Sequence, residues 1–260
     1  MARSLLAGRP AAAALTAILL LACGNDPAPG GAKQSTGQDA GGAAGPVLLQ
    51  VTVKNVSTST TATTSTGAPL PVVFGPGAYA VHAAGVDWFE PGTAATPDLE
   101  HLAEDGNPNE AEAALSARSG FDTGLFGADR LNISYDDSPI EPGGSADFLI
   151  SAAPGDRLDF GMMWSQSNDI FVATDPGGLS LFDGTAPRLG QVTSGISLWD
   201  AGTEVNQEPG LGDAQGPRQP SPGYGTPENG VITRLEGDKD GSGYSYPPLA
   251  TTLEVTIARK

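Results

Sequence analysis

Cysteine, aromatic residues and positive charge are all scarce in this 260-residue chain. It contains one Cys, 6% aromatic residues, and 13 Lys and Arg against 30 Asp and Glu, for a formal net charge of −17. A single thiol excludes an internal disulfide. Nucleic-acid affinity depends largely on cations that displace counterions from phosphates. The acid excess, with no run of Lys or Arg anywhere, therefore excludes nucleic acid as a partner.

Charged residues of either sign are also few, at 17% of the chain. A coiled coil or a helical bundle needs many more Glu, Lys and Leu residues at helical spacing, so this composition excludes both. What the chain has in abundance is 36 Gly and 22 Pro. Its length suits one β-rich domain, or at most two small ones.

The N-terminal residues have the features of an export signal. Arg3 and Arg9 precede the apolar stretch Ala11 to Ala22, which is too short to span a bilayer but typical of a secretory signal. The following Leu20-Leu21-Ala22-Cys23-Gly24 resembles the bacterial lipoprotein signal, in which the cysteine is acylated and becomes the new N-terminus. We expect residues 1–22 to be a lipoprotein signal peptide and Cys23 to be lipidated. The alternative is an ordinary cleaved signal peptide with an incidental Cys.

Lipidation of Cys23 predicts a protein anchored to a bacterial membrane, since several acyl chains on one residue hold a protein stably. Gly24 and Asn25 follow the cysteine, without the aspartate that signals inner-membrane retention in enterobacteria. An outer-membrane or cell-surface location is therefore favoured. Residues 24–46 contain no large apolar side chain, so residues 23–46 predict a disordered tether. The folded domain is expected to span 47–260.

The rest of the chain shows many short strand patterns and little helix. Only Thr96 to Arg118 looks helical, Gly75-Pro76-Gly77 looks like a turn, and Glu208 to Gly230 is expected to be a long surface loop. Without alternation of strands and helices, this pattern predicts an all-β antiparallel β-sandwich with one or two short helices. The expected strands are runs rich in β-branched or aromatic residues: Val47–Val53, Val72–Phe74, Ala78–His82, Asp147–Ala152, Arg157–Trp164, Ile170–Thr174, Ile196–Trp199, Val231–Leu235 and Leu253–Ile257.

Sequence motifs of common catalytic sites are missing. The chain has no HExxH, no GxSxG and no GxxxxGK[ST]. Its two histidines are His82, at the end of an expected strand, and His101, in a polar segment. We interpret both as structural or surface residues. The sequence therefore favours a protein that is not an enzyme.

Two of three acidic clusters are weak candidates for a cation site. Gly237 to Gly243 has Asp238 and Asp240 at the first and third positions of a calcium-loop pattern. Leu249 stands where that pattern needs a bidentate Glu, so we expect a solvated turn. The second cluster, Leu102 to Asn107, is an acidic loop that could equally be the end of a helix.

The third cluster joins two segments that flank expected strands. Asp169 comes directly before one strand, and Asp200 and Glu204 follow another. If these strands are neighbours in the sandwich, the three carboxylates converge, and Gly202 allows the chain between them to curl. Calcium, with about 6–8 oxygen ligands, would relieve their mutual repulsion. We therefore predict a calcium site with Asp169, Asp200 and Glu204 as metal ligands.

Five segments of the chain resemble the spondin domain, in the same order: Val51–Ser57, Gly77–His82, Leu99–Gly106, Met162–Val172 and Trp199–Asn206. The resemblance covers about residues 47 to 258. It implies an antiparallel sandwich similar to calcium-dependent phospholipid-binding domains. Animal members, F-spondin and mindin, are extracellular matrix adhesion proteins that bind calcium at one end of the sandwich.

The resemblance also implies metal ligands. Asp169 and Asp200 match ligand positions of the family, and Glu204 stands where animal members have Asp. A further acidic ligand of mindin corresponds to Leu149 here, with Asp147 nearby. The disulfide-forming cysteines and thrombospondin-type repeats of the animal proteins are absent, so their partners are not carried over.

Three functions fit the sequence. The favoured one is a lipid-anchored, calcium-binding adhesion or ligand-binding module of the cell envelope, with a glycan or a protein as its ligand. The alternative is a secreted metal-dependent hydrolase that uses the same acidic cluster. A hydrolase needs a general base or an activated metal-bound water, and no His stands among these acids. The third is a structural envelope protein without a ligand.

The first testable prediction concerns the anchor. Cys23→Ser removes the thiol that accepts the acyl group, so the variant should lose incorporation of labelled fatty acid and remain uncleaved or become a soluble exported form. Membrane fractionation and metabolic labelling measure both effects. A Cys23→Ser variant that still carries labelled fatty acid would contradict the lipoprotein interpretation.

Overall fold

The computed structural model describes residues 45–127, 139–235 and 240–260. The expected signal peptide, Cys23 and nearly all of the expected tether lie outside the described residues. The chain divides after Gly42, and Ala43–Lys260 forms one compact unit. In the described part of the chain, no helix is long and apolar enough to cross a membrane.

Short strands dominate this unit, and two short helices follow the fourth strand. In chain order the elements are β1 (Val47–Asn55), β2 (Ala62–Thr63), β3 (Pro69–Leu70), β4 (Phe74–Ala83), α1 (Pro97–Asp105), α2 (Asn109–Ser116), β5 (Asp122–Phe126), β6 (Ser145–Ala152), β7 (Asp156–Trp164), β8 (Ile170–Thr174), β9 (Leu179–Ser180), β10 (Phe182–Asp183), β11 (Ala186–Pro187), β12 (Gly190–Gln191), β13 (Ile196–Asp200), β14 (Thr233–Arg234) and β15 (Leu253–Arg259).

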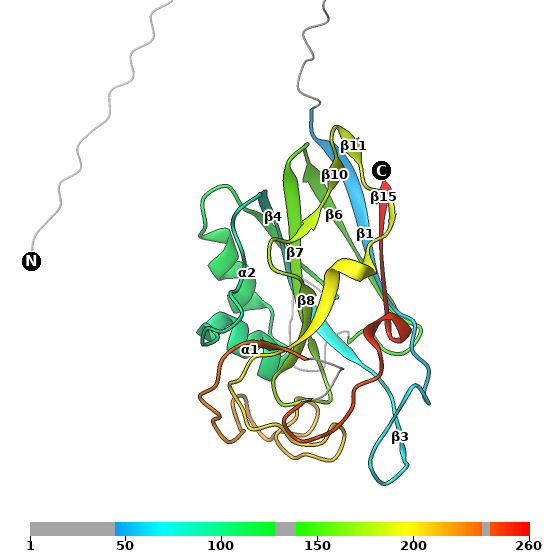
Figure 1. Cartoon of the computed structure of the whole chain (residues 1–260), viewed down its shortest axis with the longest axis vertical. Helices are drawn as coiled ribbons and strands as arrows, with labels where there is room; N and C mark the ends of the chain where they lie inside the picture. Colours follow the sequence, from blue (N-terminus) through cyan, green and yellow to red (C-terminus); the bar gives the residue numbers. More distant parts are fainter. Residues whose placement is uncertain (1–44, 128–138, 236–239) are drawn as a thin grey trace, which may run out of the picture. The chain divides into compact units, whose positions relative to one another are not determined.

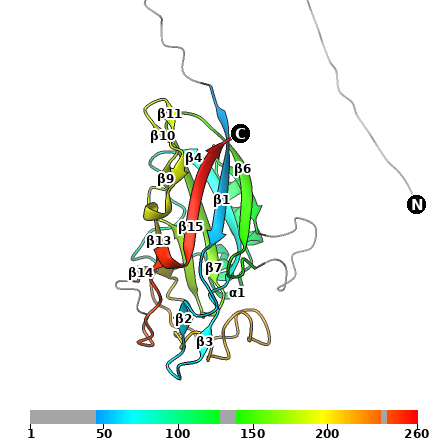
Figure 2. The ribbon, with the colours of Figure 1, turned by 90° about the vertical axis from the view of Figure 1, so that its right-hand side faces the viewer.

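The strands form two packed antiparallel sheets (Figure 1). The smaller sheet has the order β12-β15-β1-β6, and the larger has the order β14-β13-β8-β7-β4-β5, with β9 beside β7. Figure 2 shows the smaller sheet from its outer side. Two further pairs, β2-β3 and β10-β11, are small hairpins. The predicted all-β antiparallel sandwich with short helices is therefore confirmed.

The smaller sheet buries one face and exposes the other. Every second residue of β6 is buried, as expected for a strand with one face toward water. The buried residues of β1, β6 and β15 pack against the inner face of the larger sheet. The main core lies between the sheets and includes Leu49, Val51, Val53, Phe148, Ile150, Phe160, Met162, Trp164, Val172, Leu198, Val255 and Ile257.

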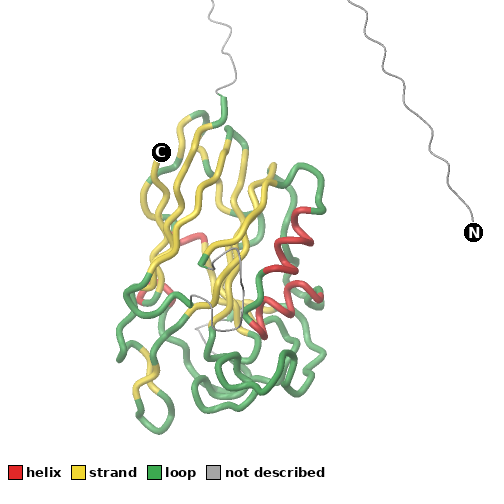
Figure 3. Tube along the Cα trace, turned by 180° about the vertical axis from the view of Figure 1, so that it is seen from behind, coloured by secondary structure: helices red, strands yellow, loops and turns green. Residues whose placement is uncertain are grey.

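The larger sheet is buried on both faces, because α1 and α2 cover its outer face (Figure 3). Ala78 and Ala80 of β4 point to this side and pack in a second core with Leu102 of α1 and Leu115 of α2. Gly161 of β7 lies under the same layer. A Cβ there would lie 3.0 Å from the Trp88 ring and 3.3 Å from Leu102. Small residues on the sheet therefore allow the helices to pack closely against it.

Several expected elements differ in detail. Gly75-Pro76-Gly77 is not a turn but part of β4, and a register shift between Phe74 and Gly77 accommodates it. The helical segment is two helices, because α1 ends at Gly106 in the left-handed conformation (φ 64°) and Pro108 precedes α2. The expected strand Val231–Leu235 contributes only the two residues of β14.

The sequence pattern does not predict strand β5, because Gly124 interrupts it. The ring of Tyr79 on β4 occupies the space of the missing side chain: a Cβ at Gly124 would lie 2.6 Å from its hydroxyl oxygen. Pairing with β4, rather than local sequence preference, therefore determines that these residues form a strand.

A buried histidine joins β4 to β7. His82 is 2% exposed. Its Nε2 lies 2.9 Å from Asp159 Oδ2, and its Nδ1 lies 2.8 Å from the Ala83 carbonyl oxygen. Burial opposes the charge of the ring, but the hydrogen bonds to Asp159 and Ala83 and the charge of Asp159 outweigh it and raise the pKa of His82 above 6.5. His82 is thus structural, as the sequence suggested.

The pKa of His82 predicts how stability depends on pH. The folded state binds the proton more tightly than the unfolded state, so this stabilisation is complete below about pH 6.5 and is lost as pH rises through the folded pKa. In denaturant titrations the free energy of unfolding should fall over this range, by at most about 1.4 kcal/mol per pH unit. His82→Gln should remove this dependence. His101→Gln, at an exposed site beside Glu110, is the control and should keep it; equal slopes in both variants would contradict the assignment.

Candidate metal centre

Two neighbouring strands bring the predicted ligands Asp169 and Asp200 to the same end of the larger sheet. β8 and β13 are antiparallel and pair Ile170 with Asp200. The residue before β8 and the last residue of β13 are therefore adjacent. We call the loops around them, 200–231 and 240–246, the acidic end. These loops lie at the lower end of the domain in Figure 1, opposite the start of β1.

Three carboxylates meet at the acidic end. Asp169, Asp200 and Glu228 each offer an oxygen, and these oxygens all lie within 4.8 Å of one another. Asp169 and Asp200 are buried, whereas Glu228 is exposed. Glu228 is held there by the backbone, since its N–H donates to the Thr203 carbonyl at 2.8 Å and the Gly230 N–H donates to Gly202 at 2.7 Å.

Asp169 is fully buried. Its Oδ2 accepts hydrogen bonds from Thr203 N at 2.8 Å, Thr203 Oγ1 at 3.2 Å and Glu204 N at 3.1 Å. Its Oδ1 is buried and has no partner among the described residues. Burial raises the pKa of Asp169 to about 8, and the nearby charge of Asp200 adds to the shift. One oxygen thus organises the loop after β13, and the other is left for a ligand.

Asp200 is 7% exposed and is held by its own loop. Its Oδ1 accepts from Gly202 N at 2.8 Å, and its Oδ2 accepts from Asn206 Nδ2 at 2.7 Å. The second bond orients the Asn206 amide and leaves its Oδ1 buried without a partner among the described residues. Burial raises the pKa of Asp200, and the negative charge of Asp240 contributes.

Gly202 has the conformation that this loop requires. Its φ is 68°, in the left-handed region, and a Cβ would lie 2.7 Å from the backbone of Val231. Both the backbone angle and the close approach of the 226–231 segment favour glycine here. The prediction that Gly202 lets the chain curl agrees with this geometry.

The burial of Asp240 contradicts the expectation that its segment is a solvated turn. It is only 7% exposed, and its Oδ1 accepts from Ser242 N at 2.9 Å and Ser242 Oγ at 2.6 Å. Its Oδ2 is buried, and the side chain of Tyr246 is buried beside it. Burial raises the pKa of Tyr246 well above 10, and the charge of Asp240, a hydrogen bond with its side chain, and the charges of Asp169 and Asp200 add to the shift. Asp238 lies outside the described residues.

Glu204, the third predicted ligand, is not one of the three grouped carboxylates. Its backbone N–H faces Asp169, while its carboxylate accepts from Gly225 N at 2.6 Å and Asn168 Nδ2 at 3.2 Å. Glu228 occupies the place predicted for Glu204. Sequence spacing could not identify Glu228, because the pairing of its segment with residues 202–203 brings it to the two aspartates.

The position that corresponds to the further acidic ligand of mindin also lies away from the acidic end. Asp147 and Leu149 are exposed on the outer side of β6, and Asp147 accepts a hydrogen bond from Thr52 on β1. Neither residue belongs to the group at the acidic end.

The chemistry of the acidic end suits a hard cation. Among the described residues, Asp169, Asp200, Glu228 and Asp240 form no ion pair with Lys, Arg or His. All candidate donors are oxygens, which Ca²⁺ and Mg²⁺ prefer, whereas softer ions prefer nitrogen and sulfur. Buried charges without a partner are costly, so a bound cation would offset a real penalty.

Comparisons with models of known protein families and with curated proteins find no match to this chain. The molecule is described by its fold and its site: an all-β antiparallel sandwich with an oxygen-rich acidic cluster at one end.

A charge-neutralising variant tests the repulsion within the cluster. In chelator at about pH 9, where Asp169 is ionised, Asp200→Asn should raise the melting temperature by about 2–4 °C, which corresponds to about 1 kcal/mol for a domain of this size. The Asn206 amide can turn to accept from the new side-chain NH₂ group. Asp183→Asn, an equal change of charge on exposed β10, should have little effect. An unchanged or lower melting temperature for Asp200→Asn would contradict the repulsion.

Proposed function

We propose that this chain is a lipid-anchored, calcium-binding module for adhesion or ligand binding on a bacterial cell envelope. In this proposal the sandwich is a spondin-type domain, the protein is not an enzyme, and acylated Cys23 attaches it to the membrane. The observation that carries the proposal is the carboxylate group of Asp169, Asp200 and Glu228 together with two buried oxygens that have no partner among the described residues, Asp169 Oδ1 and Asn206 Oδ1.

A bound cation would explain several features at once. It would give Asp169 Oδ1 a partner, reduce the repulsion between Asp169 and Asp200, and bring in the exposed Glu228. Water molecules would complete the about 6–8 oxygen ligands of Ca²⁺. The cation would thereby join β8, β13 and the loops that follow, which is the role expected of a structural calcium ion.

The arrangement of the domain supports display of this end toward a partner. β1 begins at the end of the sandwich opposite the acidic end (Figure 1). The expected tether from Cys23 would therefore join the domain at the end opposite the acidic end. The acidic-end loops also carry exposed large apolar side chains, which suit contact with a protein or glycan ligand: Val205, Leu211, Tyr224 and Val231.

A metal-dependent hydrolase is the less favoured function. His82 is buried in an ion pair with Asp159, and His101 lies 3.2 Å from Glu110 between the two helices. Neither joins the carboxylates of the acidic end. Without a nearby imidazole, an all-oxygen cluster suits a structural cation better than the activation of water.

Calcium should stabilise the domain Ala43–Lys260. At a tenfold excess over its Kd, a ligand specific for the folded state adds about 1.4 kcal/mol to the free energy of unfolding. For a domain of this size, that corresponds to an increase of about 3–6 °C in melting temperature. Calorimetry in millimolar calcium and then in chelator measures the shift. Asp169→Asn should remove most of it.

The control for this experiment is Asp183→Asn, which removes one negative charge from the opposite end of the domain and should retain the calcium shift. If wild type shows no shift, or if Asp169→Asn and Asp183→Asn keep equal shifts, the calcium site is wrong. If calcium stabilises wild type and magnesium does so equally, the site is a general divalent site.

A further inference from the structure

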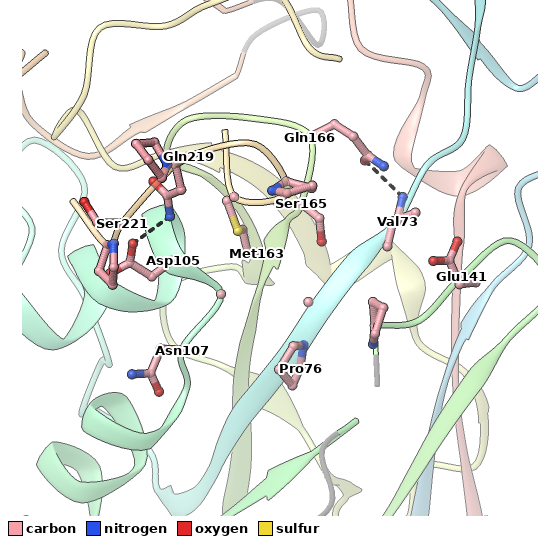
Figure 4. A pocket seen from close by; sticks show the side chains of 17 residues that line it. Val73, Pro76, Asp105, Asn107, Glu141, Met163, Ser165, Gln166, Gln219 and Ser221 are labelled. Carbon is pink, nitrogen blue, oxygen red and sulfur yellow. Dashed lines mark hydrogen bonds between the residues drawn. The ribbon is translucent and has the colours of Figure 1, made fainter. Parts of the chain in front are cut away.

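A second feature of the acidic end is a cavity of about 590 Å³ (Figure 4). It lies between the end of α1, the beginning of β4, the end of β7 and the segment 216–222. Its volume lies in the range of about 300–1,000 Å³ that is typical of small-molecule sites. None of the residues that line it belongs to the carboxylate group of Asp169, Asp200 and Glu228.

Hydrogen-bond acceptors and apolar groups line this cavity, and cationic side chains do not. Asp105 and Glu141 lie on opposite sides of it, and Met163 and Pro76 lie between them (Figure 4). No Lys, Arg or His is among the described residues of its lining. Further prolines add apolar walls. A ligand would therefore meet negative charge at both sides and an apolar surface between them.

Gln219 links the segment 216–222 to Asp105 at the end of α1. Its Nε2 donates to Asp105 Oδ1 at 2.9 Å and lies 3.4 Å from the Glu104 carbonyl. These two acceptors determine the orientation of the amide. Its Oε1 is buried and has no donor among the described residues. Asp105 itself is 8% exposed and also accepts from Gly223 N at 3.1 Å.

Two further buried carboxylates strengthen the negative charge on this side of the cavity. Glu104 and Glu204 are 4% and 3% exposed. Burial raises the pKa of Glu104 to about 7, and the charges of Glu204 and Asp105 contribute to the shift. Among the described residues, none of these three acids is paired with a cationic side chain. Among the described residues, hydrogen bonds alone therefore offset the negative charge on the Asp105 side of the cavity.

We propose that the cavity binds a guanidinium or ammonium group on an aliphatic stem, the chemistry of an arginine or lysine side chain. The cationic head donates to Asp105, and the stem packs on Met163 and Pro76. Arginine suits the site better than lysine, because its planar group carries several donors and can donate two hydrogen bonds to one carboxylate. The site is separate from the proposed cation site and does not depend on a bound metal.

The test is a calorimetric titration of the full chain with the peptide Gly-Arg-Gly, in about 150 mM salt so that long-range attraction to the acidic surface is screened. The neutral isostere Gly-citrulline-Gly should bind about tenfold more weakly or worse, as expected for the loss of a charge-assisted hydrogen bond. Agmatine, a free guanidinium compound, distinguishes the source of the ligand. Tighter binding of the peptide indicates a protein-borne side chain, and tighter binding of agmatine indicates a free amine; both support the site.

Variants of the lining residues test whether Gly-Arg-Gly binds in the cavity. Asp105→Asn, which keeps an acceptor for Gln219, should weaken Gly-Arg-Gly by about tenfold. Glu141→Gln, at an exposed position that folding does not need, should weaken it by a smaller factor. Asp183→Asn and Asp169→Asn should bind like wild type.

Three outcomes would overturn the proposal. They are equal binding of the arginine and citrulline peptides, equal weakening by Asp105→Asn and Asp183→Asn, or loss of binding in Asp169→Asn alone, which would place the peptide at the carboxylate group instead. None of these results depends on the calcium response, so the two proposals fail separately.

Discussion

The antiparallel pairing of β8 with β13 is the constraint on which the acidic end depends. Because Ile170 lies opposite Asp200 in this pair, the residue before one strand and the last residue of the other must be neighbours. Asp169 then uses one oxygen to hold the backbone of the loop after β13. Its other oxygen has no partner among the described residues. The same pairing that completes the larger sheet thus concentrates negative charge in a buried position.

Burial makes this charge chemically significant. Exposed carboxylates are common in so acidic a chain and interact weakly through water. Asp169 and Asp200 differ, because the sheet, the 226–231 segment and the loop that carries Asp240 exclude water from them. Their raised pKa values reflect this desolvation. A divalent cation or protonation can compensate for it, and the oxygen-only donor set favours a hard cation.

The acidic end combines two distinct acceptor-rich regions. One is the carboxylate group of Asp169, Asp200 and Glu228, and the other is the cavity beside Asp105. Glu204 connects them, since its backbone binds Asp169 while its charge acts on Glu104. The long loop between β13 and β14 supplies residues to both regions. The opposite end holds the buried His82–Asp159 pair.

The sequence by itself determined the sandwich class, most strand positions, and the placement of Asp169 and Asp200 at strand ends. These follow from alternation of apolar residues and from acids placed directly at strand ends, which are local signals. The convergence of the two aspartates depends on the pairing of β8 with β13. Tertiary structure alone decided that β4 runs through Gly75-Pro76-Gly77 and that Glu228, rather than Glu204, joins the two aspartates. It also decided that Asp240 is buried. The physical reason is that each of these depends on backbone pairing or packing between segments far apart in the chain, which local patterns do not encode.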